Sequence, residues 1–161
     1  MFDAETMALA TAVLAACRAR GWRVATAESC TGGLVAAALT AISGSSDIVD
    51  RGFVTYSNKA KTELLGVPET TFTAVGAVSA EIAEAMAAGA VRCAGVDLAV
   101  SATGIAGPGG GSIAKPVGLV YLGVATRDSC RSERHVFPGD RDNVRRAAMI
   151  RALEMLKVAA G

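Results

Sequence analysis

Apolar runs and polar breaks alternate along the chain with two different spacings, which predict helices and strands in turn. Helices are expected over about residues 3–20, 34–42, 59–65, 79–94 and 140–158. Strands are expected over about residues 23–27, 52–56, 97–102, 117–126 and 131–137. Serine, asparagine and aspartate stand at several predicted helix starts, and glycine stands at several ends. About five strands and five helices in this order indicate an α/β fold.

The order of these elements also predicts how the sheet is built. No helix separates the last two strands, so they are expected to form a hairpin, which makes the sheet mixed. No linker or repeat divides residues 1–161, so one domain with helices on both faces of the sheet is expected. In such sheets ligands bind outside the carboxyl ends of the strands. The segments expected there are 28–33, 56–61 and 103–111.

Composition narrows the class of function. Sixteen Lys and Arg face fifteen Asp and Glu, for a net charge of +1, so no nucleic-acid or anionic-membrane partner is expected. The four cysteines form no CxxC pair, so neither a metal site nor a disulfide framework is expected. The N-terminus lacks the features of a signal peptide, and no apolar run reaches about eighteen residues, so a cytoplasmic location is expected.

Ser29 is a candidate nucleophile because it follows a predicted strand and precedes a glycine-containing turn and a helix. Backbone N–H groups near such a turn can hold an oxyanion while the hydroxyl attacks a carbonyl. The alternative is that Ser29 or Thr31 only caps the helix. Cys30 is a rival nucleophile, but a thiolate would need a histidine partner, and nothing places the only one, His135, near it.

The base that would activate Ser29 is expected to be a lysine. A single histidine argues against a Ser-His-Asp triad, whereas a buried lysine can be neutral near pH 7. Lys59 and Lys61 both follow the second predicted strand, and helical geometry lets only one of them face the crevice. Tyr56 could hold that lysine or relay a proton. The alternative for Lys61 is an ordinary surface lysine.

The segment Thr103–Gly111 contains five glycines and could cradle an anion with its backbone N–H groups. It matches neither of the common phosphate-binding glycine motifs. The alternative is a flexible turn that leads into the hairpin.

Taken together, short motifs along nearly the whole chain resemble the CinA C-terminal domain family. They are Ala27-Glu28-Ser29-Cys30-Thr31-Gly32-Gly33, Gly44-Ser45-Ser46, Gly52-Phe53-Val54-Thr55-Tyr56-Ser57-Asn58, Lys61, Gly76-Ala77-Val78-Ser79, Thr103-Gly104-Ile105-Ala106-Gly107-Pro108, Lys115-Pro116-Val117-Gly118 and Gly139-Asp140-Arg141. The resemblance implies a three-layer α/β/α sandwich with a mixed, mostly parallel sheet of about five strands. Many members carry a further domain upstream, and a length of 161 residues leads us to expect the stand-alone form.

The resemblance also implies an activity, which is hydrolysis of the carboxamide of nicotinamide mononucleotide to nicotinic acid mononucleotide and ammonia. It implies a catalytic serine at Ser29, a lysine at Lys61 and a supporting tyrosine at Tyr56, with no metal and no cofactor. Further positions are expected to bind the substrate or its oxyanion. They are Cys30, Thr31, Gly32, Ser46, Thr103, Gly104 and Gly107, with Arg141 or Arg145 for the phosphate, unless these arginines only form a solvated helix face.

Two other classes of function remain as alternatives. A non-catalytic nucleotide-binding or regulatory module would keep the glycine loop without requiring Ser29 or Lys61. A nucleotide pyrophosphatase would need a carboxylate cluster for Mg²⁺, and the sequence offers only isolated acids such as Glu28 and Asp97 near strand ends. The alanine-rich helix 79–94 leaves a homo-oligomer open.

Overall fold

The computed structural model describes all residues from 1 to 161. Its helices are α1 (Ala4–Arg20), α2 (Leu34–Thr40), α3 (Asn58–Leu65), α4 (Glu69–Val75), α5 (Ala80–Ala94) and α6 (Arg141–Ala160), with a 3₁₀ turn η1 (Ser45–Asp47). Its strands are β1 (Val24–Glu28), β2 (Val49–Val54), β3 (Leu98–Gly104), β4 (Leu119–Thr126) and β5 (Cys130–Val136). None of the helices combines the length and the apolar composition that a membrane span requires.

The strands form one five-stranded sheet in the order β2-β1-β3-β4-β5. β1 pairs in parallel with β2 and β3, whereas β4 pairs antiparallel with both β3 and β5. Only β4 therefore runs against the other strands, and the predicted mixed sheet with a terminal hairpin is confirmed. The carboxyl ends of β1, β2, β3 and β5 all lie at one edge of the sheet.

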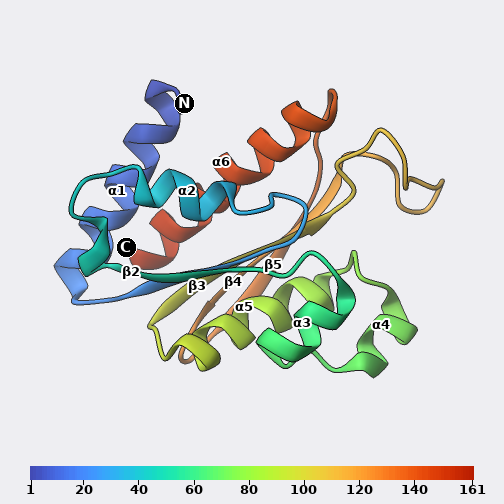
Figure 1. Cartoon of the computed structure of the whole chain (residues 1–161), viewed down its shortest axis with the longest axis horizontal. Coiled ribbons are helices and arrows are strands. Elements are labelled where there is room, and N and C mark those ends of the chain that lie inside the picture. The colour runs from blue at the N-terminus through green and yellow to red at the C-terminus, as the bar shows by residue number, and fades with distance from the viewer.

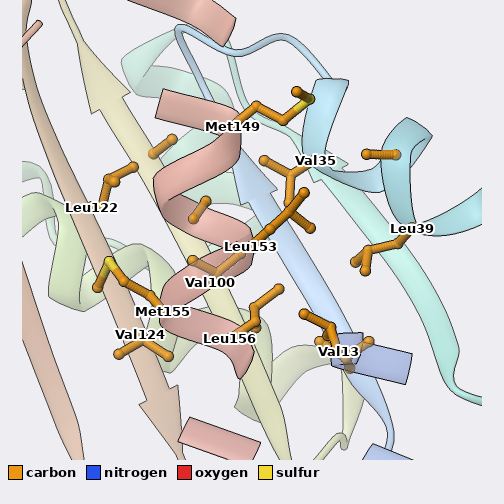
Figure 2. Packing of buried hydrophobic residues seen from close by; sticks show 14 of the residues in the cluster. Val13, Val35, Leu39, Val100, Leu122, Val124, Met149, Leu153, Met155 and Leu156 are labelled. Atoms are coloured by element: carbon orange, nitrogen blue, oxygen red, sulfur yellow. The ribbon is translucent and has the colours of Figure 1, made fainter. Parts of the chain in front are cut away.

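Helices cover both faces of the sheet, which makes three layers. α1, α2 and α6 lie on one face, and α3, α4 and α5 lie on the other (Figure 1). On the first face, Val35 of α2 and Leu153 of α6 pack with Val100 of β3 (Figure 2). On the second face, Leu65 of α3 joins the buried side chains of α5 in a separate cluster. α3 reaches the sheet mainly through α5, which lies directly on β1, β3 and β4.

The helix starts follow the capping signals of the sequence. The side chains of Asp3, Ser57, Ser79 and Asp140 each accept a hydrogen bond from the backbone N–H three residues later. Helices α1, α3 and α5 end at glycines in the left-handed conformation. These local signals explain why most predicted boundaries agree with the structure to within two residues.

Two elements differ from the sequence prediction. Helix α4 was not expected, because its threonines favour extended structure and none of its side chains is fully buried. Strand β2 begins at Val49 rather than near residue 52, because an edge strand tolerates the polar residues Asp50 and Arg51. Tyr56, expected at its end, lies beyond the strand.

Candidate active site

Ser29 and Lys61 lie in hydrogen-bond contact at the carboxyl edge of the sheet. Ser29 directly follows β1, and its backbone N–H donates to the Ala102 carbonyl of β3 at 2.9 Å. Lys61 belongs to α3, which begins soon after β2, and its Nζ lies 3.1 Å from the Ser29 Oγ. The Lys61 side chain is fully buried, with 2% of its surface exposed. Lys59 instead points to solvent and pairs with Glu63 at 3.5 Å.

The surroundings of Lys61 favour its neutral form. Burial lowers the pKa of its ammonium below the ordinary value of 10.5, and the Cys30 thiol opposes this only as a smaller effect. Lys61 forms no ion pair, and its Nζ hydrogen-bonds to the Ser29 hydroxyl. A neutral amine in this place can accept the hydroxyl proton.

Cys30 lacks what a cysteine nucleophile needs. Burial raises the pKa of its thiol to about 11, which disfavours the thiolate. His135 lies on β5, with β3 and β4 between it and β1. Its Nε2 lies 2.9 Å from Glu133, and its ring stacks on Phe137. The geometry therefore offers no imidazole to Cys30.

Glu28 holds the turn that follows Ser29, a role that the sequence did not reveal. Its buried carboxylate accepts hydrogen bonds from the N–H groups of Gly33, Val35 and Ala36 at 3.0, 3.1 and 2.8 Å. Glu28, rather than Ser29 or Thr31, therefore caps α2. The available signal was a helix whose N-cap position is a glycine, which has no side chain to cap it.

A pocket of about 240 Å³ opens in front of the Ser29–Lys61 pair. The expected site residues that line it are Ser29, Cys30, Tyr56, Lys61, Thr103, Gly104 and Arg141. Four further lining residues were not predicted individually, and they are Asn58, Ala77, Val78 and Ala106. Two of them, Asn58 and Ala106, lie within the segments expected at this end of the sheet. No carboxylate lines the pocket, whereas the Arg141 guanidinium does, so the charge of the pocket suits an anionic ligand.

Tyr56 and Thr103 contact different groups from those expected. The exposed Tyr56 hydroxyl accepts a hydrogen bond from the Arg141 Nη2 at 3.0 Å, and not from Lys61. Arg141 also donates to the Gly107 carbonyl at 2.9 Å. The Thr103 hydroxyl donates to the Ala77 carbonyl at 2.7 Å, which joins β3 to the segment before α5. Arg141 reaches the pocket because α6 begins soon after the carboxyl end of β5.

Arg145, one turn further along α6, lies behind the turn rather than in the pocket. Its Nε donates to the Cys30 carbonyl and its Nη2 to the Thr31 carbonyl, both at 3.2 Å. Thr31 is fully buried, and the Gly32 N–H donates to the Ser29 carbonyl at 3.0 Å. Thr31, Gly32 and Arg145 thus shape the turn but do not line the pocket.

The structure does not bring Ser46 to this site. Ser46 lies in η1, directly before β2, and the first residue of β2, Val49, pairs with Val24 at the start of β1. Because β1 and β2 are parallel, η1 lies at the amino end of the sheet, opposite Ser29. The expected substrate contact of Ser46 is therefore absent from this arrangement.

The acidic and metal-binding side chains do not gather at the site. No three His, Cys, Asp or Glu residues lie together as a metal would require. The functional groups of the pocket lining include the Ser29 hydroxyl, the Lys61 amine and the Arg141 guanidinium.

Several known proteins are similar to this chain in sequence and in fold. Residues 6–159 match the CinA C-terminal domain. Nicotinamide-nucleotide amidohydrolase PncC of Escherichia coli (strain K12) is 52% identical over 157 residues, which are 97% of this chain and 95% of that protein. The chain of PncC from Enterobacter agglomerans is 54% identical, over 87% of this chain and 86% of that protein.

Longer relatives and a solved structure are also similar. The CinA-like protein of Geobacter sp. (strain M21) is 56% identical over 87% of this chain, which spans 34% of that relative's length. The crystal structure of the competence/damage inducible protein CihA from Agrobacterium tumefaciens superposes with a TM-score of 0.96 at 47% identity. That superposition covers 99% of this chain and 98% of the other.

Proposed function

The chain belongs to the CinA C-terminal domain family, and we propose that it hydrolyses the carboxamide of nicotinamide mononucleotide to nicotinic acid mononucleotide and ammonia. Two relatives that align over most of their length carry the name nicotinamide-nucleotide amidohydrolase. The observation that carries the proposal is the buried 3.1 Å contact between the Lys61 Nζ and the Ser29 Oγ at the wall of a pocket.

In the first step, neutral Lys61 accepts the proton of Ser29 while the Ser29 oxygen attacks the carboxamide carbon. The positive charge of the pyridinium ring makes this carbon more electrophilic. The carbonyl oxygen becomes an oxyanion, which the N–H of Cys30 can bind because it directly follows the nucleophile. A well-placed donor of this kind typically contributes about 3 kcal/mol to the transition state.

In the second step, the Lys61 ammonium returns its proton to the amide nitrogen, and the carbon–nitrogen bond breaks to release ammonia. The acyl group is then an ester of Ser29. Lys61, neutral again, takes a proton from water as the water attacks the ester. As the ester bond breaks, the Lys61 ammonium gives this proton to the Ser29 oxygen, and the product leaves as a carboxylic acid that loses its own proton to water.

Arg141 is the proposed anchor for the phosphate of the substrate. It lines the pocket and lies against the glycine loop through Gly107, and a guanidinium can bind a phosphate with two parallel hydrogen bonds. Arg145 does not line the pocket. Under this proposal residues 1–161 act as one catalytic domain in pyridine nucleotide recycling, and the cytoplasmic location stays a prediction.

Ammonia release from nicotinamide mononucleotide tests the proposal. The unmodified protein should release ammonia with and without EDTA, and Ser29→Ala and Lys61→Met should lower the rate at least about 10³-fold. Lys59→Met, which changes an exposed lysine on the same helix, should keep the full rate. Full activity of Ser29→Ala would contradict the mechanism. Nucleotide binding without ammonia release would support the regulatory alternative, and loss of activity with EDTA would support a metal enzyme.

A further inference from the structure

We propose that Arg145 is a positioning residue that aims the oxyanion-binding N–H groups of the turn after Ser29, rather than a ligand of the substrate phosphate. This inference rests on the proposed function. Arg145 does not itself line the pocket, and both of its hydrogen bonds go to carbonyls of this turn. It therefore acts on the reaction through the backbone of Cys30 and Thr31.

Only two backbone N–H groups between Ser29 and Ala36 donate to no oxygen within the chain, and they are those of Cys30 and Thr31, which lie near the Cys30 sulfur. The Ser29 N–H donates to Ala102, the Gly32 N–H to Ser29 and the Leu34 N–H to Thr31. The remaining N–H groups of this stretch donate to the Glu28 carboxylate. Cys30 and Thr31 are themselves buried, so their N–H groups require an explanation. A ligand oxygen beside Ser29 supplies one.

The bond to the Cys30 carbonyl determines where the Thr31 N–H points. The two groups belong to one planar peptide unit, in which C=O and N–H point in opposite directions. Because the Arg145 Nε holds the Cys30 oxygen at 3.2 Å, the Thr31 N–H is directed away from α6. The next peptide behaves the same way. Its carbonyl, on Thr31, faces Arg145, and its N–H, on Gly32, donates back to Ser29.

Without Arg145 the Cys30–Thr31 peptide would lose its only hydrogen bond within the chain. The turn continues through Gly32 and Gly33, whose φ angles of 63° and 101° give the backbone freedom to reorient. A reoriented peptide would present its carbonyl to the developing oxyanion and repel it. The guanidinium also polarises the peptide, which strengthens the Thr31 N–H as a donor.

The inference separates Arg145 from Arg141 by kinetics. A residue that acts only on the oxyanion changes kcat, whereas a residue that binds the phosphate in both ground and transition states changes KM. Arg145→Met should therefore lower kcat about 10- to 100-fold and change KM less than about threefold. Arg145→Lys, which keeps one charged donor, should recover part of kcat. Arg146→Met is the matched control, since Arg146 lies on the outer side of α6 and pairs with Asp3 and Glu5.

A second measurement does not depend on nicotinamide mononucleotide as the substrate. A small alkyl fluorophosphonate reacts with an activated serine to form a Ser29 oxygen–phosphorus bond, and fluoride leaves while Lys61 takes the proton. The phosphoryl oxygen needs the same N–H groups, so Arg145→Met should be labelled about 10-fold or more slowly than the unmodified protein and Arg146→Met. Thermal unfolding verifies that all three proteins are folded.

The outcomes are distinct. A slower rate of Ser29 labelling in Arg145→Met alone supports the inference. If the unmodified protein is labelled but releases no ammonia, only the proposed substrate is wrong. Equal labelling rates, or a rise in KM at unchanged kcat, would overturn the inference and return Arg145 to phosphate binding. If Arg145→Met does not fold, the labelling rate of Arg145→Lys is compared with those of the unmodified protein and Arg146→Met instead.

Discussion

The Tyr56 phenol and the Arg141 guanidinium are joined by a 3.0 Å hydrogen bond across 85 positions of sequence. Tyr56 follows β2, and Arg141 begins α6. Because Arg141 also holds the Gly107 carbonyl at 2.9 Å, three distant segments meet at the mouth of the pocket. Tyr56 therefore orients Arg141, the proposed phosphate anchor, rather than the Lys61 amine.

Removal of the Tyr56 hydroxyl should weaken substrate binding more than it slows the chemical step. We expect Tyr56→Phe to raise KM about three- to tenfold, because a typical hydrogen bond contributes about 1 kcal/mol and this one is exposed to solvent. kcat should change less than threefold. Tyr121→Phe, on β4, is the matched control. If kcat falls more than 100-fold at constant KM in steady-state assays, Tyr56 takes part in proton transfer, as the sequence first led us to expect.

The lowered pKa of Lys61 should appear in the pH dependence of the reaction. kcat/KM should rise with pH as Lys61 loses its proton, with the midpoint below the ordinary value of 10.5. An ordinary solvated lysine would give a midpoint near that value. The pH–rate profile of ammonia release measures it, and a rate independent of Lys61 protonation would contradict a lysine base.

The same shift should affect stability. As the pH falls from about 10.5 to the pKa of folded Lys61, the unfolded chain binds a proton that the folded chain does not, so the free energy of unfolding decreases. The free energy of unfolding of Lys61→Met does not have this decrease, so it should rise relative to that of the unmodified protein as the pH falls through this interval. At lower pH the difference between the two proteins should be constant. Urea unfolding at several pH values measures the effect, and Lys59→Met should show none.

Glu28→Gln should weaken both the fold and the catalyst. The carboxylate accepts three backbone N–H groups, whereas a glutamine amide would turn an N–H₂ donor toward at least one of them. We expect a loss of about 1–3 kcal/mol in the free energy of unfolding, measured by urea titration. Glu69→Gln, an exposed change in the first turn of α4, should have little effect. An unchanged midpoint for Glu28→Gln would show that the cap is dispensable.

Gly89→Ala should disturb Lys61 from a distance. A Cβ at Gly89 of α5 would lie 2.2 Å from the Leu65 carbonyl at the end of α3, so the two helices would have to separate. We expect a net loss of about 1–3 kcal/mol in stability and a lower kcat. Gly109→Ala is the control, because a Cβ there meets nothing within 4 Å. Thermal unfolding and ammonia release measure the two effects, and a Gly89→Ala protein with unchanged kcat would show that α3 adapts.

Local signals in the sequence were sufficient for most of the fold. Capping residues such as Asp3 and Asp140, and the glycines that end helices, mark boundaries without reference to the rest of the chain. Helix α4 escaped prediction because it is short and buries no side chain completely, so its apolar pattern is weak. The start of β2 was misplaced for a related reason, since an edge strand lacks the strong pattern of a central one.

The site was only partly predictable. Ser29 and Lys61 could be found because both follow strands whose carboxyl ends share one edge. Ser46 was misplaced because it was assigned from the resemblance of its motif alone, although it precedes β2 and so lies at the amino end of the sheet. Arg141 lines the pocket and Arg145 contacts the turn after Ser29 because of how α6 packs against this turn. This packing is tertiary, so no local sequence pattern predicts it.

The burial of Lys61 makes the proposed reaction depend on one short outer helix, α3. α3 packs mainly on α5 and α4, so it has less support than the sheet beneath it. If α3 loosens, water reaches the amine, protonation returns and turnover stops while the strands are still paired. Mild heating or dilute denaturant should therefore abolish ammonia release before the sheet unfolds, and cooling should restore the activity.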